Sequence, residues 1–399
     1  MRRTGRVRLD DHALIDDQGP FLGLGASYFS ALWRYRHDRS RFESDLSFLA
    51  QQGFRYARVL SMVGWFEAWK GLEIAPVNFT TRAGNTVATW PDYWQALAGL
   101  VDLSYDRFGI RTQITIFADA QLMPAKGDRL EHLWRMLTEV VAGREEKIIL
   151  LEVANEAWQN GFPGEAGVAD LREFTRWLAD RTEVLVATTS NHEGSFESVY
   201  RDSAADIATW HFSRDRAADG GWRPVIDCRR LAHVPGCPPV SSNEPIGPGS
   251  SVSSESDPAK LVLAAAYGFA SGLPMHVFHS EAGVFGRTRF EDTPAIRDFR
   301  HLMRLLPGDL PNWTSTEAGE PDAPLCAEGC VSMVCCRKDV RVVCVPVGIR
   351  SESFAVSSRM PLQLRAVDIL TGRELGVFDL APGKRTPIAL KSAAFILMN

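Results

Sequence analysis

The sequence lacks any apolar run of the roughly 18 residues that a membrane-spanning helix needs. Its N-terminus, MRRTGRVRLDDHAL, is basic but is not followed by an apolar segment. We therefore expect a cytoplasmic protein, unless the chain is the mature part of an exported one. An excess of positive charge is also lacking, because the net charge is -5. This balance argues against nucleic acid and anionic membranes as partners.

Signatures of metal and nucleotide binding are missing too. The sequence has no H-x-x-x-H spacing and no Gly-rich phosphate turn. Its cysteines number seven, so at least one is free or pairs with another chain. Five of them crowd into the C-terminal part with a spacing that is unusual for zinc and ordinary for strand cores: Cys326, Cys330, Cys335, Cys336 and Cys344. We therefore expect no metal and no other cofactor.

What the sequence does contain is a repeated unit of strand followed by helix. The expected strands are 21–29, 54–62, 111–119, 148–153, 183–191, 207–213, 239–245 and 274–283. The clearest expected helices are 41–52, 92–107, 129–141, 168–180, 258–271 and 294–306. Eight such units predict a closed parallel barrel, since an open doubly wound sheet more often has five or six strands and a Gly-rich turn.

The period of the pattern changes after residue 306, which predicts a second domain. Residues 1–19 resemble a polar hairpin that caps one end of the barrel, and residues 20–306 form the barrel itself. Residues 307–324 are rich in Pro, Gly and Asp and are expected to be a linker. Residues 325–399 alternate apolar and polar positions between turns. The predicted fold is α/β, a (β/α)8 TIM barrel with a small C-terminal all-β sandwich domain.

Two stretches place an Asn-Glu pair directly after an expected strand. The run KIILLEVANEAW ends in Asn155 and Glu156, and PPVSSNEPIGPG contains Asn243 and Glu244. The first pair follows the fourth expected strand and the second follows the seventh. Catalytic groups of a (β/α)8 barrel usually lie at these carboxyl-terminal strand ends.

Two carboxyl groups in this arrangement suit the cleavage of a β-glycoside with retention. One protonates the leaving oxygen and the other attacks the anomeric carbon. We predict Glu156 as the acid/base and Glu244 as the nucleophile, with Asn155 donating to the sugar 2-hydroxyl. The alternative is that both glutamates only cap the helices or loops that follow them.

This order of elements resembles the clan A glycoside hydrolases, a retaining superfamily that includes cellulases, mannanases and β-1,3-glucanases. The resemblance covers residues 20–306. It implies that Asn155-Glu156 is the acid/base motif and Glu244 the nucleophile. It also implies that Arg58 on the second strand contacts the nucleophile, and that His211 on the sixth strand lies beside it. Apart from the resemblance, Arg58 could be a plain structural ion pair and His211 a satisfied polar group.

The sequence departs from this family pattern at two places. The run Asn243-Glu244-Pro245 looks more like a fourth-strand motif than a seventh-strand one. The eighth strand ends in His279-Ser280-Glu281, where many family members have a tryptophan. If the strand before Glu281 is the seventh strand of the barrel, Glu281 becomes the competing nucleophile.

Tryptophans just after expected strands are candidates for sugar subsites, because pyranose rings present apolar C–H faces that stack on indole. Core packing is the alternative for each of them. The predicted substrate-binding residues are Asn155, Arg58, His211, Trp65, Trp69, Trp158, Asn243, His279 and Glu281.

The combined prediction is a retaining β-glycoside hydrolase without a cofactor. The long aromatic loop of residues 63–91 favours endo action on a β-glucan or β-mannan type oligosaccharide or polysaccharide. Two alternatives stay open: a catalytically silent glycan-binding barrel, and a metal-dependent barrel hydrolase that uses Glu244, His279 and Glu281. The oligomeric state is not indicated by the sequence.

Overall fold

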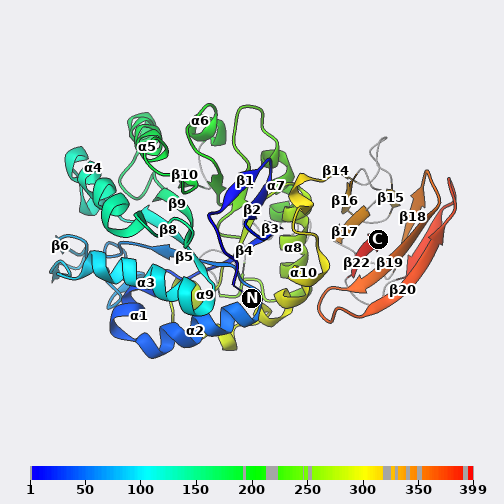
Figure 1. The fold of residues 1–399 in the computed structure, drawn as a ribbon, viewed down its shortest axis with the longest axis horizontal. Coiled ribbons are helices and arrows are strands. Elements are labelled where there is room, and N and C mark those ends of the chain that lie inside the picture. The colour runs from blue at the N-terminus through cyan, green and yellow to red at the C-terminus, as the bar shows by residue number, and fades with distance from the viewer. Residues whose placement is uncertain are drawn as a thin grey trace.

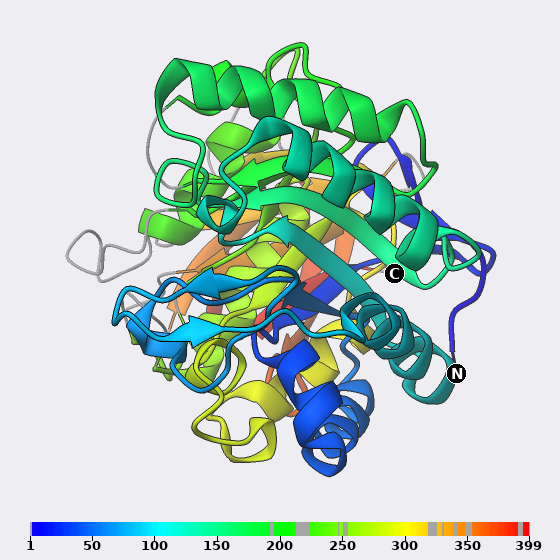
Figure 2. The ribbon, with the colours of Figure 1, turned by 90° about the vertical axis from the view of Figure 1, so that its left-hand side faces the viewer.

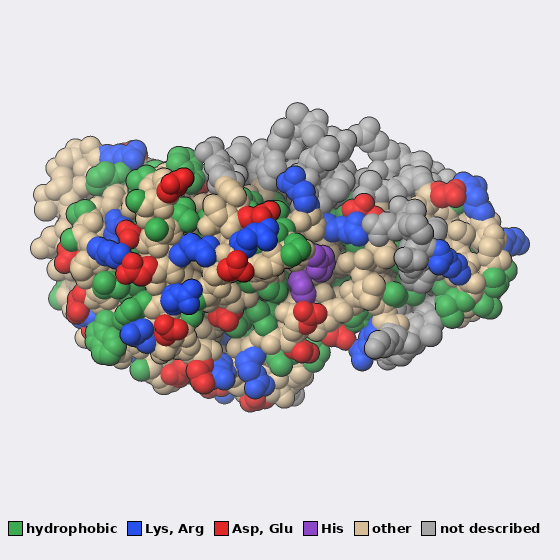
Figure 3. Space-filling view, turned by 90° about the horizontal axis from the view of Figure 1, so that it is seen from above, with side chains coloured by type: hydrophobic (Ala, Val, Ile, Leu, Met, Phe, Trp, Pro, Cys, Tyr) green, Lys and Arg blue, Asp and Glu red, His purple; other side chains and the backbone are tan. Residues whose placement is uncertain are grey.

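The computed structural model describes residues 2–191, 195–212, 223–245, 247–249, 254–317, 325–328, 331–337, 342–347, 353–389 and 394–398. A barrel surrounded by helices occupies one side of the molecule, and two antiparallel sheets occupy the other (Figure 1). No helix among the described residues is both long and apolar enough to cross a membrane. Acidic and basic side chains are interspersed over the face drawn in Figure 3.

The barrel strands are β4 (Gly23–Ser27), β5 (Tyr56–Leu60), β8 (Arg111–Phe117), β9 (Ile148–Asn155), β10 (Val186–Ser190), β11 (Ala208–Trp210), β12 (Val240–Ser242) and β13 (Met275–Phe278). They are parallel and adjacent in the order β10-β9-β8-β5-β4-β13-β12-β11. A parallel bridge between Asn191 and Trp210 joins the two ends of this series. Every residue of these strands is buried, as expected for a parallel sheet covered by helices. The predicted (β/α)8 barrel and the positions of its eight strands are confirmed.

Helices lie around the strands, as Figure 2 shows from the barrel side. The α-helices are α1 (Ala31–His37), α2 (Arg39–Gln51), α3 (Tyr93–Phe108), α4 (Lys126–Arg135), α5 (Gly164–Ala179), α6 (Phe196–Tyr200), α7 (Arg223–Ala232), α8 (Pro258–Ala270), α9 (Glu281–Val284) and α10 (Phe299–Leu305). The helix expected at 129–141 is α-helical only to Arg135 and continues as a π-helix, Met136–Val141. Short 3-10 turns are Glu67–Trp69, Ala120–Leu122, Phe290–Asp292, Ile296–Asp298 and Leu310–Asn312.

Local sequence signals explain where two of the longer helices begin and end. The helix α3 stops at Gly109, whose φ of 68° is left-handed and therefore favours glycine. The helix α8 starts with Pro258 after Asp257, whose side chain accepts a hydrogen bond from the N–H of Ala259.

The N-terminal residues form a small antiparallel sheet of β1 (Arg8–Asp10), β2 (Ala13–Asp16) and β3 (Gly19–Phe21). The expected hairpin therefore has a third strand. Its apolar residues Leu14 and Phe21 pack with Tyr56 and Met275, which lie at or near the amino-terminal ends of their barrel strands. The sheet thus covers the end of the barrel opposite to the expected catalytic end.

The C-terminal part consists of two facing antiparallel sheets. One has the order β14-β16-β17-β22-β19-β20, and the other β15-β18-β21. The strands are β14 (Thr314–Glu317), β15 (Leu325–Glu328), β16 (Val331–Cys336), β17 (Val342–Val347), β18 (Ser353–Ser358), β19 (Leu362–Asp368), β20 (Glu374–Leu380), β21 (Thr386–Ala389) and β22 (Ala394–Met398). Apolar residues of both sheets share one core, so the fold is a β-sandwich as predicted.

Part of the segment expected to be a linker belongs to these packed domains. Leu310 is fully buried, and β14 pairs with β16 as an edge strand of the larger sheet. Residues 318–324 of that segment lie outside the described residues. The sandwich rests on α8, where the Cys335 thiol donates to the carbonyl oxygen of Ala270 at 3.0 Å. Of the C-terminal cysteines, Cys330 lies outside the described residues, as does the side chain of Cys326.

Two strands of the aromatic loop pair as a short hairpin, β6 (Phe79–Thr80) with β7 (Thr86–Val87). The ring of Phe79 in this hairpin packs closely against Gly64, so the hairpin folds back on the start of the loop of residues 63–91.

Candidate active site

The two predicted glutamates meet at the carboxyl-terminal end of the barrel. Glu156 directly follows β9, and Glu244 lies two residues after β12. A carboxylate oxygen of each and a ring nitrogen of His211 all lie within 4.8 Å of one another. Glu156 has a φ of 40°, a left-handed conformation that a non-glycine residue adopts at an energetic cost of about 1 kcal/mol or more. Such strain is often found at functional sites.

The guanidinium of Arg58 holds both strand ends in place. It is fully buried and donates from Nη1 to Glu244 Oε1 at 2.6 Å and from Nη2 to Asn155 Oδ1 at 2.7 Å. Its Nε and Nη2 also donate to Oε2 of Glu152, at 3.2 and 3.1 Å. Because the guanidinium is a rigid planar fork, these contacts fix the position of Glu244 relative to β9.

Glu152 lies beneath the site and was not predicted from the sequence. It is fully buried and accepts from Thr115 Oγ1 at 2.5 Å and from Asn243 Nδ2 at 2.9 Å. Gln113 in turn donates to Asn243 Oδ1 at 3.1 Å. The structure thus places Asn243, predicted to bind substrate, in a buried network below the cleft. The available signal was a charged residue inside the otherwise apolar run IILLEVA.

Two histidines lie against the glutamates. His211 Nδ1 is 3.2 Å from Glu156 Oε1, and its Nε2 is 3.4 Å from Glu244 Oε1. His279 Nε2 is 3.7 Å from Glu244 Oε2, while its Nδ1 is 2.8 Å from the hydroxyl of Ser27. Gln159 Nε2 donates to Glu156 Oε2. His211 therefore bridges the two carboxylates.

The surroundings of Glu244 favour its ionised form. Burial by itself raises the pKa of this carboxyl, and the neighbouring Glu156 acts in the same direction. The neighbouring His211, His279 and Arg58 act in the opposite direction and outweigh both, so the pKa of Glu244 is lowered to about 2. Since this lies below the ordinary value of 4.5, ionised Glu244 contributes stability above pH 4.5, and the contribution is lost as the pH falls toward 2.

The glutamates open into a hollow of about 360 Å³ with several aromatic walls. The aromatic residues that line it are Phe29, Phe66, Trp69, Trp158 and Phe285. Trp158 is 41% exposed, so it lies at the rim. The indole N–H of Trp69 donates to the carbonyl oxygen of Val284 at 2.8 Å, which fixes that ring on the eighth-strand side. Apolar rings beside carboxylates suit a pyranose, which has both C–H faces and hydroxyls.

Six residues of the predicted set do not line this hollow. Four of them have their place in the contacts around the glutamates described above: Arg58, His211, Asn243 and His279. The other two are Trp65 and Glu281. Trp65 is half-buried with the guanidinium of Arg82 5.6 Å from its ring centre, and the next residue, Phe66, lines the hollow instead. Glu281 accepts from the backbone N–H groups of Arg287 and Thr288 at 3.1 and 2.9 Å, so it closes its own loop. Glu281, the competing nucleophile, thus does not line the hollow that Glu156 and Glu244 share.

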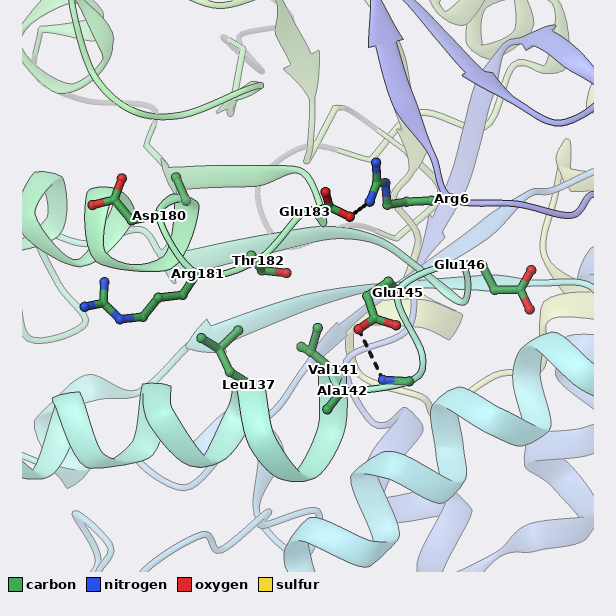
Figure 4. Close-up of a pocket in the computed structure, with 12 residues that line it drawn as sticks. Arg6, Leu137, Val141, Ala142, Glu145, Glu146, Asp180, Arg181, Thr182 and Glu183 are labelled. Carbon is green, nitrogen blue, oxygen red and sulfur yellow. Dashed lines mark hydrogen bonds and ion pairs between the residues drawn. The ribbon is translucent and has the colours of Figure 1, made fainter.

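A second, larger hollow of about 870 Å³ lies near the amino-terminal ends of β9 and β10 (Figure 4). Its lining includes Arg6, which pairs with Glu183, and Glu145, which accepts from the N–H of Gly143 at 3.2 Å. Active sites of (β/α)8 barrels lie at the carboxyl-terminal ends of the strands, so this hollow at the opposite end is a poor candidate for catalysis.

Comparison with known proteins identifies the fold. No family model matches the sequence, and no curated protein matches it. Among solved structures, a glycoside hydrolase family 5 protein from Bacteroides vulgatus is 14% identical, with a TM-score of 0.68 over 99% of this chain and 94% of that chain. An endo-1,4-β-D-mannanase from Thermotoga petrophila is 17% identical, with a TM-score of 0.51 over 72% of this chain and 100% of that chain.

A maltogenic α-amylase from Thermotoga neapolitana is also similar, at 8% identity and a TM-score of 0.54 over 94% of this chain and 98% of that chain. Because a mannanase and an amylase both superpose on this chain, the fold does not by itself select a substrate. The chain therefore shares the barrel fold of these structures.

Proposed function

We propose that the protein is a retaining β-glycoside hydrolase. The observation that carries this proposal is the approach of carboxylate oxygens of Glu156 and Glu244 to within 4.8 Å. Retaining enzymes hold their two carboxyl groups about 5–5.5 Å apart, whereas inverting enzymes separate them by about 6.5–9.5 Å to admit a water molecule. The ionised state of Glu244 fits a nucleophile.

In the proposed first step, Glu244 attacks the anomeric carbon while Glu156 protonates the departing glycosidic oxygen. The C–O bond to the leaving sugar breaks, and a glycosyl ester on Glu244 forms. In the second step, Glu156 takes a proton from water, the water oxygen attacks the same carbon, and the ester bond breaks to free Glu244. In this mechanism Asn155, whose Oδ1 accepts from Arg58 Nη2 at 2.7 Å, donates to the sugar 2-hydroxyl.

The proposed substrate is a β-glucan or β-mannan type chain that is cut internally. Aromatic rings from several loops line the hollow, and Trp158 extends it toward solvent. This suits a substrate that occupies more than one subsite. The structural similarity to a mannanase is compatible with this choice.

The experiment is reducing-sugar release from a panel of β-glucans, mannans and xylans. We expect the wild type to cleave at least one polymer, with the product first formed as the β-anomer by NMR. Glu281→Ala is the matched control, because Glu281 lies at the end of a neighbouring strand but outside the hollow, and it should keep most of the activity. An α-anomeric first product would contradict retention. Glycan binding without any cleavage would favour the silent glycan-binding alternative.

We also expect activity to survive a chelator. Ligand atoms of Glu156, His211 and Glu244 are close enough to hold a cation. However, Arg58 Nη1 already binds Glu244 at 2.6 Å, and its charge repels a metal ion at that oxygen. Incubation with EDTA should leave kcat unchanged. Loss of activity that a divalent metal restores would instead support the metal-dependent alternative.

A further inference from the structure

Asp119 is a third acid of the cleft. It lies two residues after β8, is 2% exposed and lines the same hollow as Glu156 and Glu244. The double-displacement steps do not use it. A carboxyl group buried at the mouth of the barrel therefore needs a separate explanation.

One oxygen of Asp119 holds the aromatic loop. Oδ2 accepts from the backbone N–H of Gly64 at 2.7 Å and from that of Trp65 at 3.2 Å. At this point the chain passes very close to its own hairpin. A Cβ on Gly64 would lie 2.1 Å from the ring of Phe79, so the position needs glycine. Asp119 thus fixes the beginning of the segment that brings Trp69 to the cleft.

The other oxygen of Asp119 is held less tightly. Among the described residues, Oδ1 has one contact of hydrogen-bond type, with Gln121 Nε2 at the long distance of 3.4 Å. A buried carboxylate oxygen with only one long hydrogen bond can accept a further hydrogen bond from an N–H or O–H donor. Sugar hydroxyls are such donors.

We propose that Asp119 is a substrate-binding and loop-positioning residue. Oδ2 holds residues 63–91 at the cleft, and Oδ1 accepts a hydrogen bond from a sugar hydroxyl. The hydroxyl-binding part rests on the proposed function, and it identifies an additional contact for a neutral β-linked sugar chain.

The charges around Asp119 make its role dependent on pH. Burial raises the pKa of its carboxyl to about 6. Hydrogen bonds from Gly64 and Trp65 act in the opposite direction, as does the charge of Arg82 on the loop. The other titratable groups that share the hollow are Glu156 and Glu244. Asp119 is therefore ionised at neutral pH and protonated in mild acid.

The sign of the stability effect follows from this shift. The folded-state pKa is above the ordinary value of 3.8, so the folded protein binds this proton more tightly than the unfolded chain. The resulting stability is fully present below about pH 3.8 and is lost as the pH rises through about 6. At neutral pH the protein therefore holds an ionised carboxylate in a buried position, at a cost in stability. Such a cost is common for residues that bind a ligand.

The test compares the wild type, Asp119→Asn and, as a surface control, Asp128→Asn. The Tm is measured at pH 5 and pH 7.5, which needs no turnover. We expect Asp119→Asn to gain about 2 °C relative to the wild type on going from pH 5 to pH 7.5. Asp128 is exposed on α4, so its variant should show no such change. A Tm difference between Asp119→Asn and the wild type that is the same at both pH values would overturn the assignment of a buried Asp119 that titrates between them.

The binding part is tested with the polymer that the wild type cleaves. At pH 7.5 we expect Asp119→Asn to raise KM about 10-fold and to change kcat less than about 3-fold, because a charged acceptor is replaced by a neutral one. The wild-type KM should rise toward that of the variant as the pH falls to 5, while the KM of the variant stays flat. If the wild type is active and Asp119→Asn has an unchanged KM, the hydroxyl-binding part of the proposal is overturned and the loop-positioning part is not affected. Absence of cleavage by the wild type would instead count against the proposed function. The loop-positioning role is then tested by Asp119→Ala, which removes the acceptor of the N–H groups of Gly64 and Trp65 and should lower the Tm at pH 7.5, where Asp119→Asn keeps an acceptor oxygen. An Asp119→Ala Tm equal to that of Asp119→Asn would overturn that role.

Discussion

Replacing Glu244 by alanine is expected to lower kcat by at least about 10⁴-fold, because no other group can form the glycosyl ester. Glu244 lies beneath the sugar in the proposed mechanism, with Arg58 2.6 Å away to keep it ionised. The measurement is kcat on the polymer identified in the panel, together with circular dichroism to establish that the variant is folded.

Azide provides the second half of this test. The alanine variant leaves space where the carboxylate was, so azide can attack the anomeric carbon from the same face. Turnover should return, and the product should be an α-glycosyl azide. Glu281→Ala, the matched control, should neither lose most of its activity nor respond to azide. Retention of more than about a tenth of the wild-type kcat by Glu244→Ala would exclude Glu244 as the nucleophile.

Replacing Glu156 by alanine is expected to slow polymer cleavage by about 10²–10⁴-fold, the range that a general acid contributes. The effect should depend on the leaving group. A sugar hydroxyl needs protonation to depart, whereas an activated aryl group such as 2,4-dinitrophenolate does not. In Glu156→Ala, the glycosyl ester should therefore form from a dinitrophenyl glycoside nearly as fast as in the wild type. The measurement is a pre-steady-state burst of released phenolate.

The pH dependence separates this role from a structural one. In the wild type, the rate should fall at high pH as Glu156 loses the proton that it must donate. In Glu156→Ala this high-pH limb should disappear. An equal loss of rate with dinitrophenyl and sugar leaving groups, or an unchanged high-pH limb, would contradict the assignment of Glu156 as the acid.

Much of the fold could be predicted because its signals are local. Fully apolar runs such as IILLEVA indicate buried parallel strands, and the helices between them have apolar faces that repeat with the helical period. Local signals also placed Glu156 and Glu244 at strand ends. They did not show that β3 belongs to the N-terminal sheet, or that β14 is a strand of the sandwich and not part of a linker. For such short segments, the assignment depends on the strand with which each one pairs.

The site was predicted less completely, for reasons that particular residues make clear. Trp65 and Phe66 are neighbours in the loop, and only the folded loop decides which of them faces the cleft. Glu281 follows a strand just as Glu156 does, yet its carboxylate is taken up by the N–H groups of its own loop. Asp119 follows the third strand in a run, FADAQL, that carries no motif.

The sequence by itself determined the order of strands and helices, the change to a β-sandwich and the two glutamates at strand ends. These depend on burial patterns and on residues that are close along the chain. Only the tertiary structure decided which of the acids act together. Arg58 and Glu244 are 186 positions apart, and they meet because the parallel strands close into a ring. Ring closure brings the ends of distant strands together, so the composition of the site and the ionisation of Glu244 depend on contacts that no local pattern contains.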